Sequence, residues 1–181
     1  MTRCLQTQAY ALDNEEGQSL QSLGALVSVK ATSEQTGGLF NLFEVSCPPN
    51  FATPLHIHYA EDVAIYVLDG ALTFFCGGEK KEAFPGSYSF QPRGTPHGFR
   101  VEGAAPARIL YMTIPAGFDR FVIDQELPAS KCETATAAAR YKIEAIPQVS
   151  IFKGGEEPLI TLVGEQAFGS NIARAIDSLL D

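Results

Sequence analysis

The chain is poor in basic side chains, and those it has do not cluster. Its 181 residues include 13 Lys and Arg against 21 Asp and Glu, a formal net charge of −8 at pH 7. A surface that binds a nucleic-acid duplex needs grouped Lys and Arg to displace counterions from the phosphates. The composition therefore predicts that nucleic acid is not a partner.

Long hydrophobic runs are also missing. The longest strongly apolar stretch, Val63–Leu68, is far shorter than the roughly 20 residues that span a bilayer. The opening residues MTRCLQTQAYALDN lack the continuous apolar segment of a signal peptide. We therefore expect no membrane partner and a cytoplasmic location.

Cysteine is scarce and widely spaced. The chain has four cysteines, and no two of them form a CxxC pair. Without an expected export signal, such cysteines are predicted to be free thiols with mostly structural roles.

Between residues 23 and 114 the sequence contains short apolar runs separated by turn residues. Val63–Leu68 and Ala71–Cys76 are joined at Asp69-Gly70, and this dipeptide predicts a hairpin because both positions tolerate a positive φ. Turns at intervals of about 8 to 12 residues, with β-branched and aromatic residues between them, predict a small all-β barrel or sandwich.

The composition changes after Pro128. Ala129–Tyr141 is rich in Ala and predicts a helix, whereas Val149–Phe152 and Leu159–Val163 predict strands. Ser170 could cap a final helix. This tail is too small to bury a core of its own, so we expect it to dock on the rest of the protein or on a partner chain.

The chain has only three histidines, His56, His58 and His97. Because His56 and His58 are two positions apart, a strand would project both rings from one face. A third ring from a neighbouring strand could complete a set of imidazoles around a divalent metal. The alternative is that His56 and His58 are surface or packing residues and that His97 is a turn residue bonded to the backbone.

Two stretches around these histidines resemble the motifs of the cupin family. Pro54-Leu55-His56-Ile57-His58 through Tyr66-Val67-Leu68-Asp69-Gly70 resembles the first motif, and Gly86 through Pro92, Gly94 and His97 resembles the second. The flanking segments Thr36–Phe40 and Ile114–Phe121 resemble single-domain cupins of the quercetin-dioxygenase-like kind. The resemblance implies a double-stranded β-helix (jelly-roll) barrel with a metal on His56, His58 and His97.

The predicted fold is therefore mainly β, with a cupin barrel over residues 1–130 and a small α/β extension over 131–181. Within the extension, Ala139–Val149, Phe152–Gly155 and Val163-Gly164 resemble the C-terminal half of thioredoxin. The half of thioredoxin that carries the CxxC motif has no counterpart here, so dithiol redox chemistry is not implied. We expect the extension to dock or to form a homodimer.

One position departs from the cupin pattern. The first motif usually supplies a glutamate ligand five residues after its second histidine, and here that residue is Val63. Glu61 and Asp62 are nearby, and a solvated turn is the favoured interpretation of both, although Glu61 could reach inward if the turn allows it. Three neutral imidazoles leave the metal charge uncompensated and coordination positions open, which favours an anionic ligand from outside the protein.

The resemblance implies a metal-dependent enzyme, foremost a dioxygenase of an enolisable or phenolic compound, using Fe, Ni, Mn or Zn. Because the missing glutamate is also the expected base of flavonol-type dioxygenation, the alternative is a non-catalytic ligand-binding or sensor cupin. An isomerase would need a base that the sequence does not identify. Glu61 is a catalytic candidate, and Arg93 could steer an anionic substrate. The residues predicted to line the pocket are Val63, Tyr66, Arg93, Phe99 and Tyr111, although aromatic side chains on strands are more often core.

Overall fold

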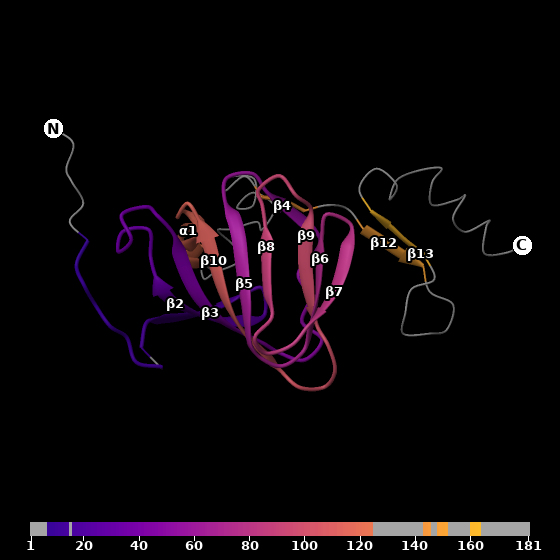
Figure 1. Cartoon of the computed structure of the whole chain (residues 1–181), viewed down its shortest axis with the longest axis horizontal. Helices are drawn as coiled ribbons and strands as arrows, with labels where there is room; N and C mark the ends of the chain where they lie inside the picture. The colour runs from indigo at the N-terminus through magenta and orange to yellow at the C-terminus, as the bar shows by residue number, and fades with distance from the viewer. Residues whose placement is uncertain (1–6, 15, 125–142, 146–147, 152–159, 164–181) are drawn as a thin grey trace, which may run out of the picture. The chain divides into compact units, whose positions relative to one another are not determined.

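Short strands make up most of the part of the chain that the structure describes (Figure 1). The computed structural model describes residues 7–14, 16–124, 143–145, 148–151 and 160–163. The prediction of a mainly β protein is confirmed, since the described residues contain a single short helix, α1 (Phe118–Asp124). None of the described helical structure is long and apolar enough to traverse a bilayer.

The strands form two main sheets. The larger one has the order β1-β2-β3-β10-β5-β8 and is antiparallel throughout, with the bounds β1 Gln18–Ser22, β2 Ala25–Ala31, β3 Asn41–Cys47, β10 Ala107–Ile114, β5 Asp62–Asp69 and β8 Tyr88–Gln91. The smaller one has the order β11-β4-β9-β6-β7, with the bounds β11 Ile143–Ala145, β4 His56–His58, β9 His97–Val101, β6 Leu72–Cys76 and β7 Glu79–Ala83. The described strands thus form two separate ladders rather than one closed ladder.

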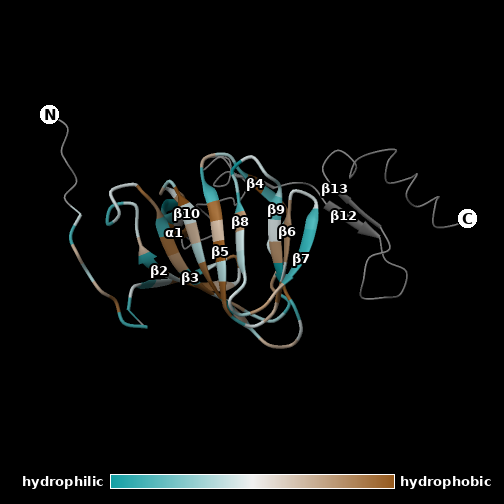
Figure 2. Ribbon diagram, viewed as in Figure 1, coloured by the Kyte–Doolittle hydropathy of each residue, from teal (hydrophilic) through white to brown (hydrophobic). Residues whose placement is uncertain are grey.

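The main hydrophobic core lies between these two sheets. Val63, Ile65 and Val67 project from one face of β5 and are fully buried, because alternate residues of a strand point to the same face. They pack in one cluster with side chains from the smaller sheet, namely Leu72, Phe74, Ala83, Phe99 and Val101. Figure 2 shows the resulting hydrophobic bands on β5 and β6, and the hydrophilic edge strand β7. The charged residues of β7 discourage that exposed edge from pairing with another chain.

The turn at Asp69-Gly70 does not close a hairpin, so this prediction is wrong. β5 pairs with β10 and β8, whereas β6 pairs with β7 and β9, so the turn carries the chain from one sheet to the other. Gly70 has φ 83°, and a Cβ there would lie 2.7 Å from Ala107. The dipeptide therefore reflects a positive φ and a close backbone approach, neither of which determines how the flanking strands pair.

The chain divides into two compact units, residues 1–144 and 145–181. The described part of the second unit is the antiparallel hairpin of β12 (Gln148–Ile151) and β13 (Ile160–Val163), which confirms the two predicted strands. The predicted helix over Ala129–Tyr141, the helix after Ser170 and the domain boundary at residue 130 all lie outside the described residues. They remain predictions.

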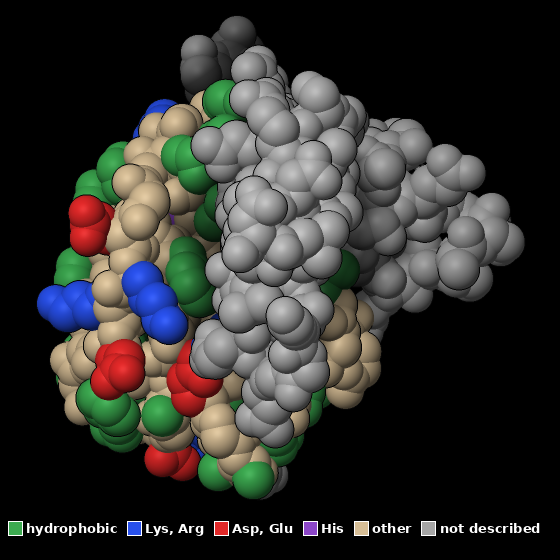
Figure 3. All heavy atoms as spheres, turned by 90° about the vertical axis from the view of Figure 1, so that its right-hand side faces the viewer, with side chains coloured by type: hydrophobic (Ala, Val, Ile, Leu, Met, Phe, Trp, Pro, Cys, Tyr) green, Lys and Arg blue, Asp and Glu red, His purple; other side chains and the backbone are tan. Residues whose placement is uncertain are grey.

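Charged side chains of both signs are interspersed on the face of the molecule that Figure 3 presents. Three surface arginines pair with acidic residues, as Arg93–Asp62, Arg100–Glu102 and Arg108–Glu44. Such exposed pairs contribute little to stability individually.

Asn41 holds α1 against the larger sheet. Its fully buried side chain accepts hydrogen bonds from the backbone N–H groups of Gly117 (2.8 Å) and Asp119 (3.3 Å) at the start of the helix. Asp119 in turn accepts bonds from the backbone and hydroxyl of Ser33. One buried amide therefore satisfies backbone donors that the hydrophobic surroundings could not.

We expect Asn41→Ala to lower the free energy of unfolding by about 2–4 kcal/mol, because it leaves two backbone donors unpaired. Chemical denaturation measures this loss. The matched control is Asn14→Ala, the same change at an exposed position, which should cost less than about 0.5 kcal/mol. Equal losses in the two variants would contradict the role given to Asn41.

Candidate metal centre

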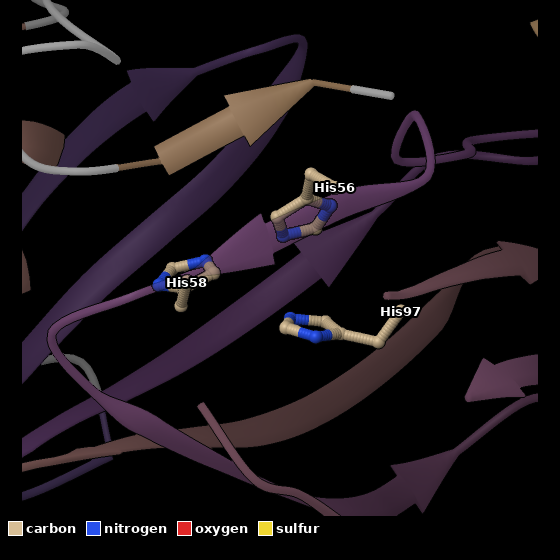
Figure 4. Close-up of side chains that lie close together, drawn as sticks. All are labelled: His56, His58 and His97. Carbon is tan, nitrogen blue, oxygen red and sulfur yellow. The ribbon is translucent and has the colours of Figure 1, made fainter. Parts of the chain in front are cut away.

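The three histidines meet on one face of the smaller sheet. His56 and His58 come from β4, and His56 is the direct cross-strand partner of His97 on β9. The ring centroids lie 4.5 Å apart for His56 and His97, 5.0 Å for His56 and His58, and 5.3 Å for His58 and His97. Figure 4 shows the three rings converging on a common space. This close grouping contradicts the alternative in which His56 and His58 form a surface pair and His97 is an isolated turn residue.

Each imidazole is oriented by a hydrogen bond at Nδ1. The Nδ1 atoms of His56 and His97 lie 2.8 Å from the carbonyl oxygens of Pro54 and Thr95, and that of His58 lies 3.3 Å from the Glu61 carboxylate. Since the two carbonyl oxygens carry no hydrogen atom, Nδ1 of His56 and Nδ1 of His97 must carry the proton, and an ionised Glu61 carboxylate requires the same of His58. The Nε2 lone pairs are therefore the ones left for another ligand, as in metal-binding histidines.

Burial favours the neutral form of two of these rings. It lowers the pKa of His56 to about 3, with a further contribution from the neighbouring His97, and it lowers the pKa of His97 to about 4. His97 Nε2 is buried without a hydrogen-bond partner. One ligand atom from each ring can be chosen so that all lie within 4.8 Å of one another. A set of converging imidazole nitrogens of this kind fits a divalent transition metal.

Glu61 lies inside the protein, which corrects the interpretation of this residue as part of a solvated turn. Only 4% of it is exposed, and its carboxylate contacts His58. Gly94 N–H donates to the His58 carbonyl (2.8 Å) and so joins the turn after His58 to the loop that precedes His97. Glu61 thus contacts the side of the His58 ring that carries Nδ1. It is not one of the three residues that could hold a metal, which are His56, His58 and His97.

Asp62 and Arg93 form a clamp on the outside of the same turns. The Arg93 guanidinium contacts the Asp62 carboxylate at 2.8 Å and donates to the carbonyls of Ala60 and Ile114. The hydrogen bonds from Arg93 lower the pKa of Asp62 to about 2. The structure therefore places Arg93 on the loop that precedes His97, with its side chain held by Asp62.

The other predicted pocket residues do not share one environment. Val63 and Phe99 are buried together in the main core between the sheets. Tyr66 projects from the opposite face of β5 and is 44% exposed, which contradicts its predicted place in the pocket. The reason is parity, because Tyr66 alternates with the inward residues of its strand.

Tyr111 is linked to the histidines through Phe118. The Phe118 ring lies 5.1 Å from His58 and 5.7 Å from Tyr111. Burial, together with the nearby Glu61 carboxylate, raises the pKa of Tyr111. Phe118 was not singled out as a site residue, since it lies far from the histidines in the sequence and only the position of α1 brings it there.

Comparison with known proteins identifies the central part of the chain. Residues 43–113 match the family described as the Cupin domain. Quercetin 2,3-dioxygenase from Bacillus subtilis (strain 168) is 32% identical over 102 residues, which make up 56% of this chain and 30% of that protein. The chain thus spans less than a third of the length of this curated relative.

Solved structures share the fold. KdgF from Halomonas sp. matches with a TM-score of 0.55 and 20% identity, covering 62% of this chain and 99% of that one. An RmlC-like cupin from Shewanella frigidimarina NCIMB 400 matches with a TM-score of 0.54 and 15% identity, covering 62% and 96%. At such identities the likeness shows the fold alone, and it confirms the predicted double-stranded β-helix.

The contact between Glu61 and His58 predicts how metal affinity responds to mutation. Glu61→Leu removes the acceptor that fixes the His58 ring and should weaken Co(II) binding by about 10- to 100-fold. Glu61→Gln keeps an acceptor oxygen and should lose less. Calorimetric titration of the metal-free proteins measures both. Equal affinities for Glu61→Leu and the wild type would show that this contact does not orient His58.

Proposed function

The chain belongs to the cupin superfamily, and from this premise we propose that it is a metal-dependent small-molecule enzyme, specifically a dioxygenase of an enolisable or phenolic compound. The observation that carries the proposal is the convergence of three imidazoles whose Nδ1 atoms are already bonded. His56, His58 and His97 would hold Fe, Ni, Mn or Zn.

A bound divalent ion would supply Lewis acidity at a substrate oxygen and, for a redox-active metal, a route for electrons to dioxygen. The described residues contribute three imidazole nitrogens and no carboxylate to the group that could hold the metal. The positive charge at the site is therefore balanced by the incoming ligand, which favours an enolate, a phenolate or a carboxylate.

Aromatic side chains beside the histidines suit such a substrate. Phe118 contacts His58, and it also contacts Tyr111 and Phe43 at centroid distances of 5.7 and 5.9 Å. This apolar wall excludes water and favours a planar organic molecule over a strongly hydrated one. Asn41 keeps α1 in place through its bonds to Gly117 and Asp119, so it acts as a positioning residue for Phe118.

The dioxygenase part of the proposal is supported by the quercetin 2,3-dioxygenase of Bacillus subtilis (strain 168) as a relative. A dioxygenase inserts both atoms of dioxygen into its substrate and so needs no external reductant. Glu61 is a buried carboxylate that contacts His58. We assign to Glu61 the role of orienting the His58 ring.

Val63 favours a second candidate, a ligand-binding or sensor cupin without catalysis. The residue is fully buried at the position where the cupin pattern places a carboxylate that could accept the substrate proton. A protein of this kind would bind the same anionic compounds and leave them unchanged. A cytoplasmic location and a homodimer remain predictions for either candidate.

The metal content tests the first step of the proposal. Protein purified without a chelator or an affinity tag should carry close to one transition-metal ion per chain by inductively coupled plasma mass spectrometry. His97→Ala should lose most of that metal, because it removes a buried ligand. Cys76→Ala, which alters the cross-strand partner of His97, is the matched control and should retain it. Metal retention by His97→Ala would contradict the ligand set.

Dioxygen consumption separates the two candidates. The metal-loaded protein should take up dioxygen in an oxygen electrode when it is mixed with a flavonol or with pentane-2,4-dione, and loaded His97→Ala should not. Binding of these compounds, detected by a change in their absorbance, without dioxygen uptake would favour the sensor. If the protein neither binds these compounds nor consumes dioxygen with them, the proposed substrate class is wrong.

A further inference from the structure

We propose that Gln91 supplies the side-chain oxygen that the three-histidine site would otherwise lack, so that an amide from β8 replaces the carboxylate that cupins usually present from β5. The inference rests on the proposed metal site and adds a fourth protein ligand to it. The sequence alone did not suggest it, because Gln91 is not among the expected ligands, although it lies in the stretch that resembles the second cupin motif.

The strand register places Gln91 directly beside Val63. Four residues form one row across the larger sheet, since Asn41 pairs with Thr113, Thr113 with Val63, and Val63 with Gln91. Directly opposed residues of antiparallel strands project from the same face. Val63 faces the interior, so Gln91 does as well, and only 1% of it is exposed.

Within this row the Gln91 oxygen is unsatisfied. The Asn41 side chain is bonded to Gly117 and Asp119, and the Thr113 hydroxyl is bonded to Asn41. Gln91 uses its Nε2 to donate to the Ser89 hydroxyl (3.2 Å), and its Oε1 is buried with no hydrogen-bond partner. Leaving a buried polar atom unpaired destabilises the folded protein. A ligand that occupies the interior would offset that destabilisation.

The row lies at the end of the sheets that carries the histidines. Val63 is the second residue of β5 and follows the turn after His58, while Gln91 ends β8 and precedes the loop that leads to His97. The two loops are tied together by the bond from Gly94 N–H to the His58 carbonyl and by the Arg93–Asp62 contacts. Gln91 and the missing glutamate thus start from neighbouring points of one interior face.

Chain length makes the replacement possible. Opposed residues have Cβ atoms about 4.5–5.5 Å apart, within the reach of long side chains. A glutamine has the same number of side-chain atoms as a glutamate, so it can present its oxygen near the space that a glutamate at position 63 would reach. An amide oxygen is a neutral ligand of hard divalent cations. The metal would keep its full charge, which preserves the preference for an anionic substrate.

Co(II) titration of the metal-free protein tests the assignment, with affinity from calorimetry and coordination from the visible absorption spectrum. Gln91→Leu should weaken binding by more than about 10-fold, the lower end of what loss of an outer-shell partner costs, and should change the spectrum. Gln91→Glu should tighten Co(II) binding by a factor of at least about 10, because the negative charge of the new carboxylate attracts the cation. Ser89→Ala removes the partner of the amide nitrogen and leaves the oxygen, so it is the matched control and should bind like the wild type.

The outcomes distinguish this inference from the proposed function. Wild-type protein that binds no Co(II) would overturn the metal site itself. Binding that is unchanged in both Gln91 variants would overturn only the role of Gln91. Val63→Glu provides the reference, since it restores a carboxylate from β5 and should make the loss of the Gln91 oxygen inconsequential in the double variant Val63→Glu/Gln91→Leu. Melting temperatures of the metal-free variants verify that each is folded; if Gln91→Leu does not fold, tighter binding by Gln91→Glu supports the inference and unchanged binding overturns it.

Discussion

The bonds at the three Nδ1 atoms are the constraint on which the rest of this site depends. A buried imidazole can neither ionise cheaply nor leave both nitrogens unpaired. Two backbone carbonyls and the Glu61 carboxylate satisfy one nitrogen of each ring, and the other nitrogen is thereby left for a ligand. Strand pairing brings His56 and His97 together, so the ligand geometry is built into the backbone of β4 and β9. The functional site is for this reason part of the folded core.

Charge distinguishes this site from the usual cupin arrangement. Replacing a ligand carboxylate with the buried Val63 removes a negative charge from the interior, and no other carboxylate joins the grouped residues. Glu61 keeps a negative charge one contact further out, on His58, where it can influence the metal without occupying a coordination position. Gln91 adds polarity on the same interior row without adding charge. In the proposed site, a ligand set without a carboxylate would leave the charge of the metal to be balanced by an anionic ligand.

The sequence predicted the chemistry of the site better than its surroundings. The spacing of His56 and His58 implied two rings on one face, and the cupin motifs added His97. The direction of Glu61 was open because a turn, unlike a strand, does not fix parity. Tyr66 was misplaced because a pocket role was assigned without applying the parity that β5 imposes. Asp69-Gly70 indicated a positive φ at Gly70, yet the pairing partners of β5 and β6 lie far away along the chain.

Local patterns by themselves indicated the β character, and together with the cupin motifs they indicated the three histidines of the candidate metal centre. These follow from alternation, turn chemistry and residue type, all of which operate over a few residues. Only the tertiary structure decided that Phe118 covers His58, that Glu61 turns inward and that Gln91 stands beside Val63. These relations depend on strand register and on the docking of α1, which are set by packing between segments that are distant in sequence.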